Sequence, residues 1–223
     1  MAETLYPGYN VLDKRDTESW NAKTREVIAH RLAVPREPRF FDQKEWAMVQ
    51  AVAARFVPQP PRTVHGHDGN GEAIPVAALV DNRLDENHKD GYRNAKLPPQ
   101  REAWRRGLHA LDAEAQAAHG APFAMLDGEL QDGLLKKMES GDLHDPAWGD
   151  MPPKLFFKHR LLRDVVYAYY SHPTAWSEIG FGGPASPRGY VRLYFNRLDP
   201  WEAIEARPGE KREPVRKENQ RVG

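Results

Sequence analysis

The sequence contains no cysteine among its 223 residues. A chain without cysteine forms no disulfide, holds no iron–sulfur cluster through thiolates and has no thiol nucleophile. Zinc sites built from cysteine are excluded for the same reason. This absence removes many enzyme classes and leaves the redox state of the compartment open.

Long apolar runs and an excess of one charge are also missing. No window approaches the roughly 18 uninterrupted apolar residues of a membrane span. The 32 basic residues balance 32 acidic residues, so no overall field attracts nucleic acid or an anionic membrane. The first residues include acidic side chains, with neither an apolar run nor a twin-arginine pair, so the chain as written shows no export signal. We therefore expect no membrane span and no nucleic-acid partner.

Helical periodicity is the main pattern that the sequence does contain. Five segments between Gln43 and Tyr170 repeat apolar residues at spacings of three and four, which predicts helices with one face in a core. The first predicted helix spans residues 43–56, and a short one begins at Pro75. A long helix ends just before Gly120, a fourth follows Asp127, and the last spans residues 154–170. Their most buried side chains should be Trp46, Trp104, Leu134, Leu161 and Val165. The expected fold is mainly α, an irregular bundle of about five helices, with one short strand at most, at residues 190–195.

Local signals mark several helix ends. Asp42 and Glu45 have the spacing of a capping box, and Gly120 follows the long helix, as helix-ending glycines do. The helical count for the segment from Pro75 places Asp81 on its polar side. These signals predict where the helices start and stop.

A segment rich in glycine, proline and aromatic residues follows the last predicted helix. His172-Pro173 should end that helix, and the run HPTAWSEIGFGGPASPRGY predicts irregular backbone, neither helix nor central strand. Its aromatic residues could form a stacking platform for a sugar or a base, but the favoured interpretation is that they pack against the backbone and fix it. The glycines that should supply positive φ angles or close approach are Gly180, Gly182, Gly183 and Gly189.

Composition divides the chain into three parts. Residues 1–38 read as a polar arm with one helix near residues 19–31, residues 39–202 as a helical domain, and residues 203–223 as a charged tail. Both ends have too few apolar residues to be expected to fold alone. Their aromatic side chains are instead candidate anchors on another protein.

Candidate chemical sites are few. His65, His67 and Asp68 lie together in the loop HGHDG, but a calcium-binding loop opening at Asp68 needs glutamate at its twelfth position, where Leu79 stands. The glycine-rich backbone offers no rigid framework for zinc or iron, so we expect no tight metal binding. We identify no catalytic residue. The alternative function is a stand-alone enzyme that acts on a small polar substrate through this loop, with or without a metal, or through the tyrosine-rich segment at the end of the last predicted helix.

The order of several motifs resembles the gluconate 2-dehydrogenase subunit 3 family. The motifs are FFDQKEWAMVQAVAARFVP, VAALVDNRL, LHALDAEAQAAHGAPFAML and AYYSHPTAWSEIGFGGPASPRGY, within residues 40–195. The resemblance implies a non-catalytic helical subunit that binds no cofactor itself. It also implies a large FAD-dependent subunit of the glucose-methanol-choline type, often joined by a cytochrome c subunit, whose folding or export the small subunit supports.

The resemblance has consequences for location and for binding. Family members commonly begin with a twin-arginine signal that this chain does not show, so we expect it in the cytoplasm as written, or in the periplasm by export with a signal-bearing partner. The family supplies no established catalytic residue to transfer. The residues that we predict to bind the partner are Tyr6, Tyr9, Trp20, Trp176, Phe181, Arg188, Tyr190 and Trp201.

Overall fold

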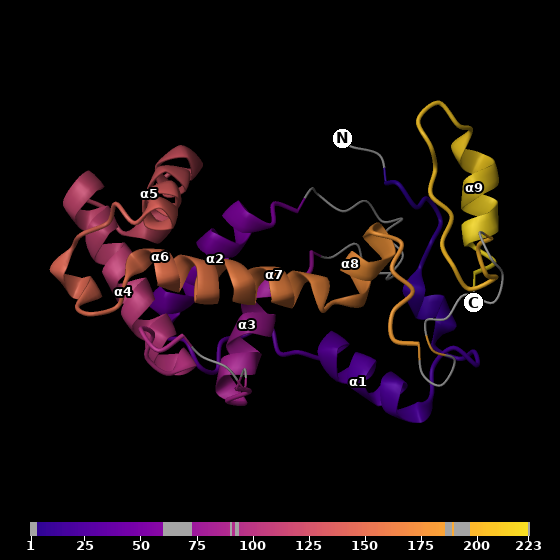
Figure 1. Ribbon diagram of the computed structural model, residues 1–223, viewed down its shortest axis with the longest axis horizontal. Helices are drawn as coiled ribbons and strands as arrows, with labels where there is room; N and C mark the ends of the chain where they lie inside the picture. Colours follow the sequence, from indigo (N-terminus) through magenta and orange to yellow (C-terminus); the bar gives the residue numbers. More distant parts are fainter. Residues whose placement is uncertain are drawn as a thin grey trace. The chain divides into compact units, whose positions relative to one another are not determined.

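The computed structural model describes residues 4–59, 73–89, 91, 94–185, 189 and 197–222. The chain forms two compact units. The terminal unit comprises Met1–Ala33, Gln59–Ile74 and Tyr170–Gly223, and the central unit comprises Val34–Pro58 and Pro75–Tyr169. Figure 1 labels the helices of both units.

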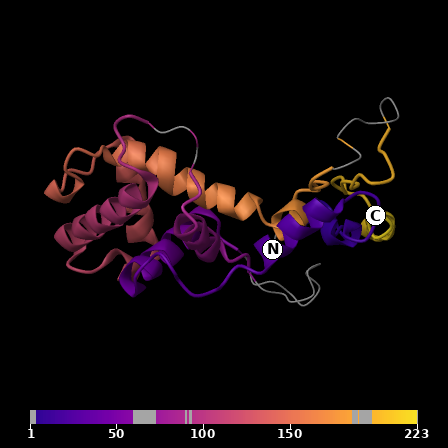
Figure 2. The same ribbon diagram turned by 90° about the horizontal axis from the view of Figure 1, so that it is seen from below.

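The central unit is a set of packed helices. Its helices are α2 (Gln43–Phe56), α3 (Val76–Asp85), α4 (Gln100–His119), α5 (Gly128–Ser140), and a continuous stretch of α6 (Pro153–Phe156), the π-helical η4 (Phe157–Leu162) and α7 (Arg163–Tyr170). Short 3-10 turns lie at η2 (Phe123–Met125) and η3 (Pro146–Trp148). The α6–α7 stretch lies along one side of α2, α4 and α5 (Figure 2). The described residues contain no strand, which confirms the mainly α fold and the approximate number of helices.

The predicted start and stop signals of the helices are present. The Asp42 carboxylate accepts from the Glu45 amide at 2.8 Å, and the Glu45 carboxylate accepts from the Asp42 amide at 3.0 Å, completing the capping box of α2. Asp127 caps α5 by accepting from the Leu130 amide at 2.9 Å, without the reciprocal bond of a capping box because residue 130 is leucine. Gly120 ends α4 with a φ angle of 68°, in the left-handed region that favours glycine. These signals need only local sequence, which explains why they were predictable.

The core of the central unit confirms four of the five predicted side chains. Trp104, Leu134, Leu161 and Val165 are buried. Trp46 is only half-buried, so that prediction is wrong. The buried face of α2 consists instead of Met48, Val49, Val52 and Ala53. α2 contacts α3, α4 and α5, and these tertiary contacts, which the periodicity of α2 does not contain, determine which of its side chains are buried.

Asp81 is buried, contrary to the prediction that it lies on the polar side of its helix. Its carboxylate accepts hydrogen bonds from the amides of Arg39, Phe40 and Phe41, at 2.7, 3.1 and 2.9 Å. These amides belong to the irregular segment before α2, where no helix supplies acceptors for them. Asp81 therefore fixes the entry into α2, a role that depends on tertiary contact.

Two further polar side chains lie on the buried face of the α6–α7 stretch. Asp164 is 3% exposed and accepts hydrogen bonds from the indole of Trp104 at 2.9 Å and the amide of Gln100 at 3.2 Å. Arg160, one turn earlier, is 2% exposed. The apolar stripe read from the sequence is therefore interrupted by charged groups, and Asp164 joins the N-terminal part of α4 to α7.

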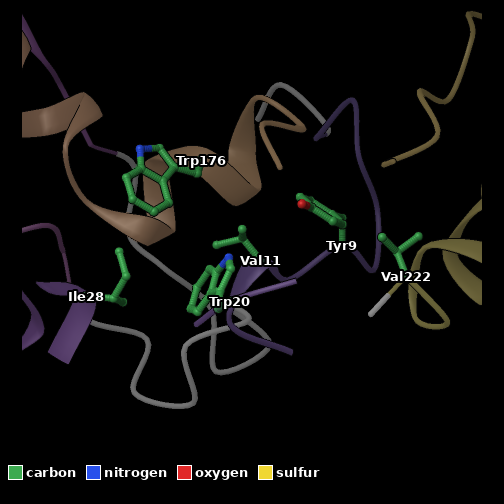
Figure 3. Close-up of a cluster of buried hydrophobic side chains, with 6 residues drawn as sticks. All are labelled: Tyr9, Val11, Trp20, Ile28, Trp176 and Val222. Atoms are coloured by element: carbon green, nitrogen blue, oxygen red, sulfur yellow. The ribbon is translucent and has the colours of Figure 1, made fainter. Parts of the chain in front are cut away.

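The terminal unit contains η1 (Val11–Lys14), α1 (Ala22–Leu32), α8 (Pro173–Glu178) and α9 (Arg212–Asn219). A cluster of buried apolar side chains joins its segments, as Figure 3 shows. The members are Tyr9, Val11, Trp20, Ile28, Trp176 and Val222. The two chain ends thus contribute to a core, and the expectation that they bury too little apolar surface is wrong at these residues. The predicted division at residues 38 and 202 stays a prediction.

The irregular segment predicted after His172 begins with a helix, which corrects that part of the prediction. Pro173 occupies the first helical position of α8, where its missing N–H costs no hydrogen bond. The Nδ1 atom of His172 accepts from the Thr174 amide at 3.2 Å and caps the helix. Proline therefore ends one helix here and opens the next.

Candidate functional site

Two glycines shape the backbone that follows α8. Gly180 and Gly183 have φ angles of 68° and 69°. A Cβ atom at Gly180 would lie 2.4 Å from the Tyr6 ring, so the absent side chain leaves the space that this ring occupies. A Cβ atom at Gly183 would lie 3.1 Å from Val11 and 3.2 Å from Trp20. The predicted roles of these glycines are confirmed, and both positions receive residues from the N-terminal segment.

Aromatic side chains hold the same backbone in place. The rings of Trp176 and Phe181 meet edge to face, with centroids 5.7 Å apart. The Trp176 indole donates to the carbonyl of Tyr170 at 2.6 Å, and the Tyr9 hydroxyl donates to the carbonyl of Phe181 at 3.2 Å. The expectation that aromatic residues fix this segment by packing is confirmed. Phe181 nevertheless keeps 39% of its surface exposed.

Lys14 connects the N-terminal segment to residues near the C-terminus. It is fully buried, and its Nζ atom donates to the carbonyl of Trp201 and lies 5.5 Å from the centre of the Tyr9 ring. Beside it, the Val11 amide donates to the Ser177 hydroxyl at 3.1 Å. The first residues of the chain are therefore held by α8 and by residue 201.

Asn219 makes the second connection between the two ends. It is fully buried, and its side-chain oxygen accepts from the Ile204 amide at 2.7 Å. Its side-chain nitrogen donates to the carbonyls of Ile204 and Pro7, at 2.9 and 3.0 Å. The Ala206 amide also donates to the Leu5 carbonyl at 2.7 Å. We call this set of contacts among residues 5–7, 204–206 and 219 the terminal clasp.

A pocket of about 870 Å³ lies within the terminal unit. Its aromatic walls are Tyr6, Phe181 and Trp201, and glycines 180, 182 and 183 form part of its backbone lining. Its charged lining residues are Asp199, Glu202, Glu205, Arg207 and Glu210. Binding sites for small molecules span about 300 to 1,000 Å³, so the pocket is large enough to receive more than one side chain.

The charged groups give the pocket an acidic character, because four of its five charged lining residues carry carboxylates and only Arg207 carries a positive charge. Two of the carboxylates also brace the backbone: Glu202 accepts from the Asp199 amide at 2.7 Å, and Glu210 accepts from the Arg207 amide at 2.9 Å. Burial raises the pKa of the Tyr6 hydroxyl, and the negative charge of Glu205 raises it further. A tyrosine hydroxyl is protonated near neutral pH even without this shift, and both effects favour the same neutral form.

The structure separates the predicted partner-binding residues into three groups. Tyr9, Trp20 and Trp176 lie in the buried cluster, and their role is to hold the terminal unit together. Tyr6, Phe181 and Trp201 line the pocket. Arg188 and Tyr190 lie outside the described part of the chain, as do the weak metal candidates His65, His67 and Asp68.

Sequence reasoning missed the residues that assemble the pocket. Lys14 and Asn219 carried no signal, because a single lysine or asparagine in a polar segment is normally solvated. Glu205 and Glu210 were visible only as part of the charged tail that begins at residue 203, and Asp199 and Glu202 at the end of the predicted helical domain carried no signal. Within the described ranges, no group of three or more histidine, aspartate or glutamate side chains is placed to hold a metal ion. No helix in those ranges combines the length and the apolar character that crossing a membrane requires.

One family model matches the chain. It is described as "Gluconate 2-dehydrogenase subunit 3" and covers residues 43–183, which is more than half of the sequence. The match begins at the first residue of α2 and ends at Gly183, beside the pocket. No curated protein and no solved structure is significantly similar to the chain.

Proposed function

The chain belongs to the gluconate 2-dehydrogenase subunit 3 family, and we propose that it is the non-catalytic accessory subunit of a flavin-dependent sugar or polyol dehydrogenase. In this proposal the FAD and the reacting residues belong to a large subunit of the glucose-methanol-choline type. A cytochrome c subunit is a further expected member of the complex. The role of the small subunit, the present protein, is to support the folding, stability or export of the large subunit.

The family match carries this proposal, and its extent is informative. It includes the helices from α2 to α8 and the glycine segment up to Gly183. The matched region therefore ends in backbone that lines the pocket, in addition to covering the helical core. A family defined as a subunit implies a surface for another subunit, and this backbone is a candidate part of it.

Exposed apolar side chains support a binding role for the pocket region. Phe181 and Leu198 both line the pocket and are 39% and 49% exposed. Large apolar groups that remain exposed next to a concave, charged lining are typical of interaction sites. A partner that covered them would remove apolar surface from water.

The buried carboxylates of the central unit have structural partners. Asp81 accepts from three backbone amides, and Asp164 accepts from the indole of Trp104. Asp112 accepts from the Phe123 amide at 2.9 Å and pairs with Lys44 at 2.7 Å. These contacts explain why the carboxylates are buried without assigning them to catalysis, which favours the accessory role over the stand-alone enzyme.

Co-purification tests the proposal. The full chain, carrying an affinity tag, is expressed in its source organism, and the retained material is separated by size while its visible absorbance is recorded. We expect a flavin spectrum in a complex that contains the chain and a larger subunit, together with sugar or polyol oxidation by that complex. Flavin bound stoichiometrically to the isolated chain, or substrate oxidation by the isolated chain, would contradict the proposal.

A further inference from the structure

We propose that the pocket of the terminal unit receives a basic segment of the large subunit, with a lysine or arginine side chain between Tyr6, Phe181 and Trp201. This inference rests on the proposed function, because it names where and by which chemistry the accessory subunit binds. The cation would lie near Glu202 and Glu205, and the apolar part of the segment would cover Phe181 and Leu198.

The first support for this proposal is that the pocket is assembled before any partner arrives. Its lining comes from remote parts of the sequence, namely Tyr6, residues 180–183, Gly189 and residues between 198 and 210. Asn219 bonds Ile204 of the lining to Pro7, the neighbour of Tyr6, and Lys14 donates to the carbonyl of Trp201. A lining held in this way loses little conformational freedom on binding, and this favours affinity.

The second support is charge complementarity. Four carboxylates and one guanidinium line the pocket. The negative charge of Glu205 also helps to raise the pKa of the Tyr6 hydroxyl. An acidic concave lining attracts a positively charged segment and disfavours an acidic one. The expected occupant is therefore basic.

The third support is the aromatic part of the lining. Lysine and arginine side chains bind favourably over aromatic rings within about 6 Å. The same unit already uses this contact twice: Arg31 lies 5.7 Å from the centre of the Trp176 ring, and Lys14 lies 5.5 Å from that of Tyr9. Three aromatic walls beside carboxylates can thus bind both the charge and the apolar stem of a basic side chain.

Substitutions that change the charge at position 205 test the proposal. Glu205 is exposed, so these substitutions should preserve the fold. Affinity of the full chain is measured for the flavoprotein subunit recovered in the complex, at low and at high salt. Glu205→Gln should weaken binding at low salt, and Glu205→Lys should weaken it further, by about five-fold or more, because attraction becomes repulsion. High salt should reduce both effects.

A matched control is available on α9 of the same unit. Glu213 has a side chain that is 66% exposed and lies outside the pocket lining. Glu213→Lys makes the same change in net charge and should leave the affinity within about two-fold of the unchanged chain, because exposed ion pairs contribute little. An equal loss in both lysine variants would show that only the overall charge matters, which contradicts docking at the pocket.

Hydrogen exchange gives an independent measurement. Amides of residues 199–206 should exchange more slowly in the complex than in the isolated chain. If the flavoprotein binds the Glu205 variants as tightly as the unchanged chain and these amides gain no protection, the pocket proposal fails while the proposed function stands. If the chain binds no flavoprotein at all, both proposals fail.

Discussion

The Tyr6 ring lies directly on the backbone of Gly180, so close that a Cβ atom at position 180 would come within 2.4 Å of it. The two residues are 174 positions apart in the sequence, and both line the pocket. This contact joins the first described residues of the chain to the glycine segment that ends the family match. The pocket therefore depends on a residue outside the matched region.

Gly180→Ala should destabilise the terminal unit. The new methyl group would overlap the Tyr6 ring, and the φ angle of 68° is unfavourable for alanine, so we expect a loss of about 1 to 3 kcal/mol in the free energy of unfolding. Denaturant titration followed by tyrosine and tryptophan fluorescence measures it.

The control for this change is Gly133→Ala in α5. Gly133 has no neighbouring atom within 4 Å of an added Cβ, and alanine is favoured over glycine inside a helix by roughly 0.5 to 1 kcal/mol. We therefore expect a gain in stability at position 133. A Gly180→Ala variant as stable as the unchanged chain would show that Tyr6 does not lie where the structure places it.

Asn219→Ala should open the terminal clasp. The change leaves the amide and carbonyl of Ile204 and the carbonyl of Pro7 without these partners, in a site that is fully buried. Unsatisfied buried groups cost about 1 to 3 kcal/mol each, and relaxation toward water reduces the total. Faster hydrogen exchange of the Ile204 amide is the expected observation. The exposed neighbour Gln220, changed to alanine, should leave this amide protected.

Asp81 offers a graded test of the central unit. Asp81→Asn keeps one acceptor oxygen for the three amides of residues 39–41, whereas Asp81→Ala keeps none. We expect alanine to cost about 2 to 4 kcal/mol of unfolding free energy and asparagine to cost less. Equal, small effects in a denaturant titration would mean that water replaces Asp81 at these amides.

The ion pair between Arg55 and Asp132 should contribute to stability only above acidic pH. A hydrogen bond from Arg55, at 2.6 Å, lowers the pKa of Asp132 below its usual value of 3.8 and raises the pKa of Arg55. Because the folded pKa of Asp132 is lowered, its contribution is present above the unfolded pKa and is lost as the pH falls through the folded pKa. Arg55→Gln should therefore destabilise the chain at neutral pH and have little effect in strong acid. A loss that did not change with pH would exclude the carboxylate as its cause.

The local parts of the fold followed from the sequence, and the tertiary parts did not. The capping box at Asp42 and the glycine that ends α4 depend on residues a few positions apart, so their spacing was sufficient. Burial of Asp81 and Asp164 depends on amides and an indole supplied by other segments. Hydrophobic periodicity contains no information about such partners, and for this reason both carboxylates were expected at the surface or left unassigned.

The aromatic residues and the glycines of the candidate site were predictable, and its charged residues were not. Tyr6, Phe181 and Trp201 were identified as binding candidates, and the structure places all three on the pocket. Tyr9 and Trp20 were given the same role but lie in the buried cluster, because the composition of the ends concealed the core that they share with Trp176 and Val222. Low average hydropathy does not prevent folding when a few large side chains converge.

Binding to a flavoprotein subunit is the central claim, and the most direct measurement of it is the absorbance spectrum of the tagged chain after affinity purification and separation by size. The predicted result is a flavin spectrum that elutes only with a complex larger than the chain of 25.4 kDa, while the isolated chain is colourless and inactive. A chain that elutes alone with stoichiometric flavin, or that oxidises gluconate or glucose with an artificial electron acceptor, would contradict the accessory role.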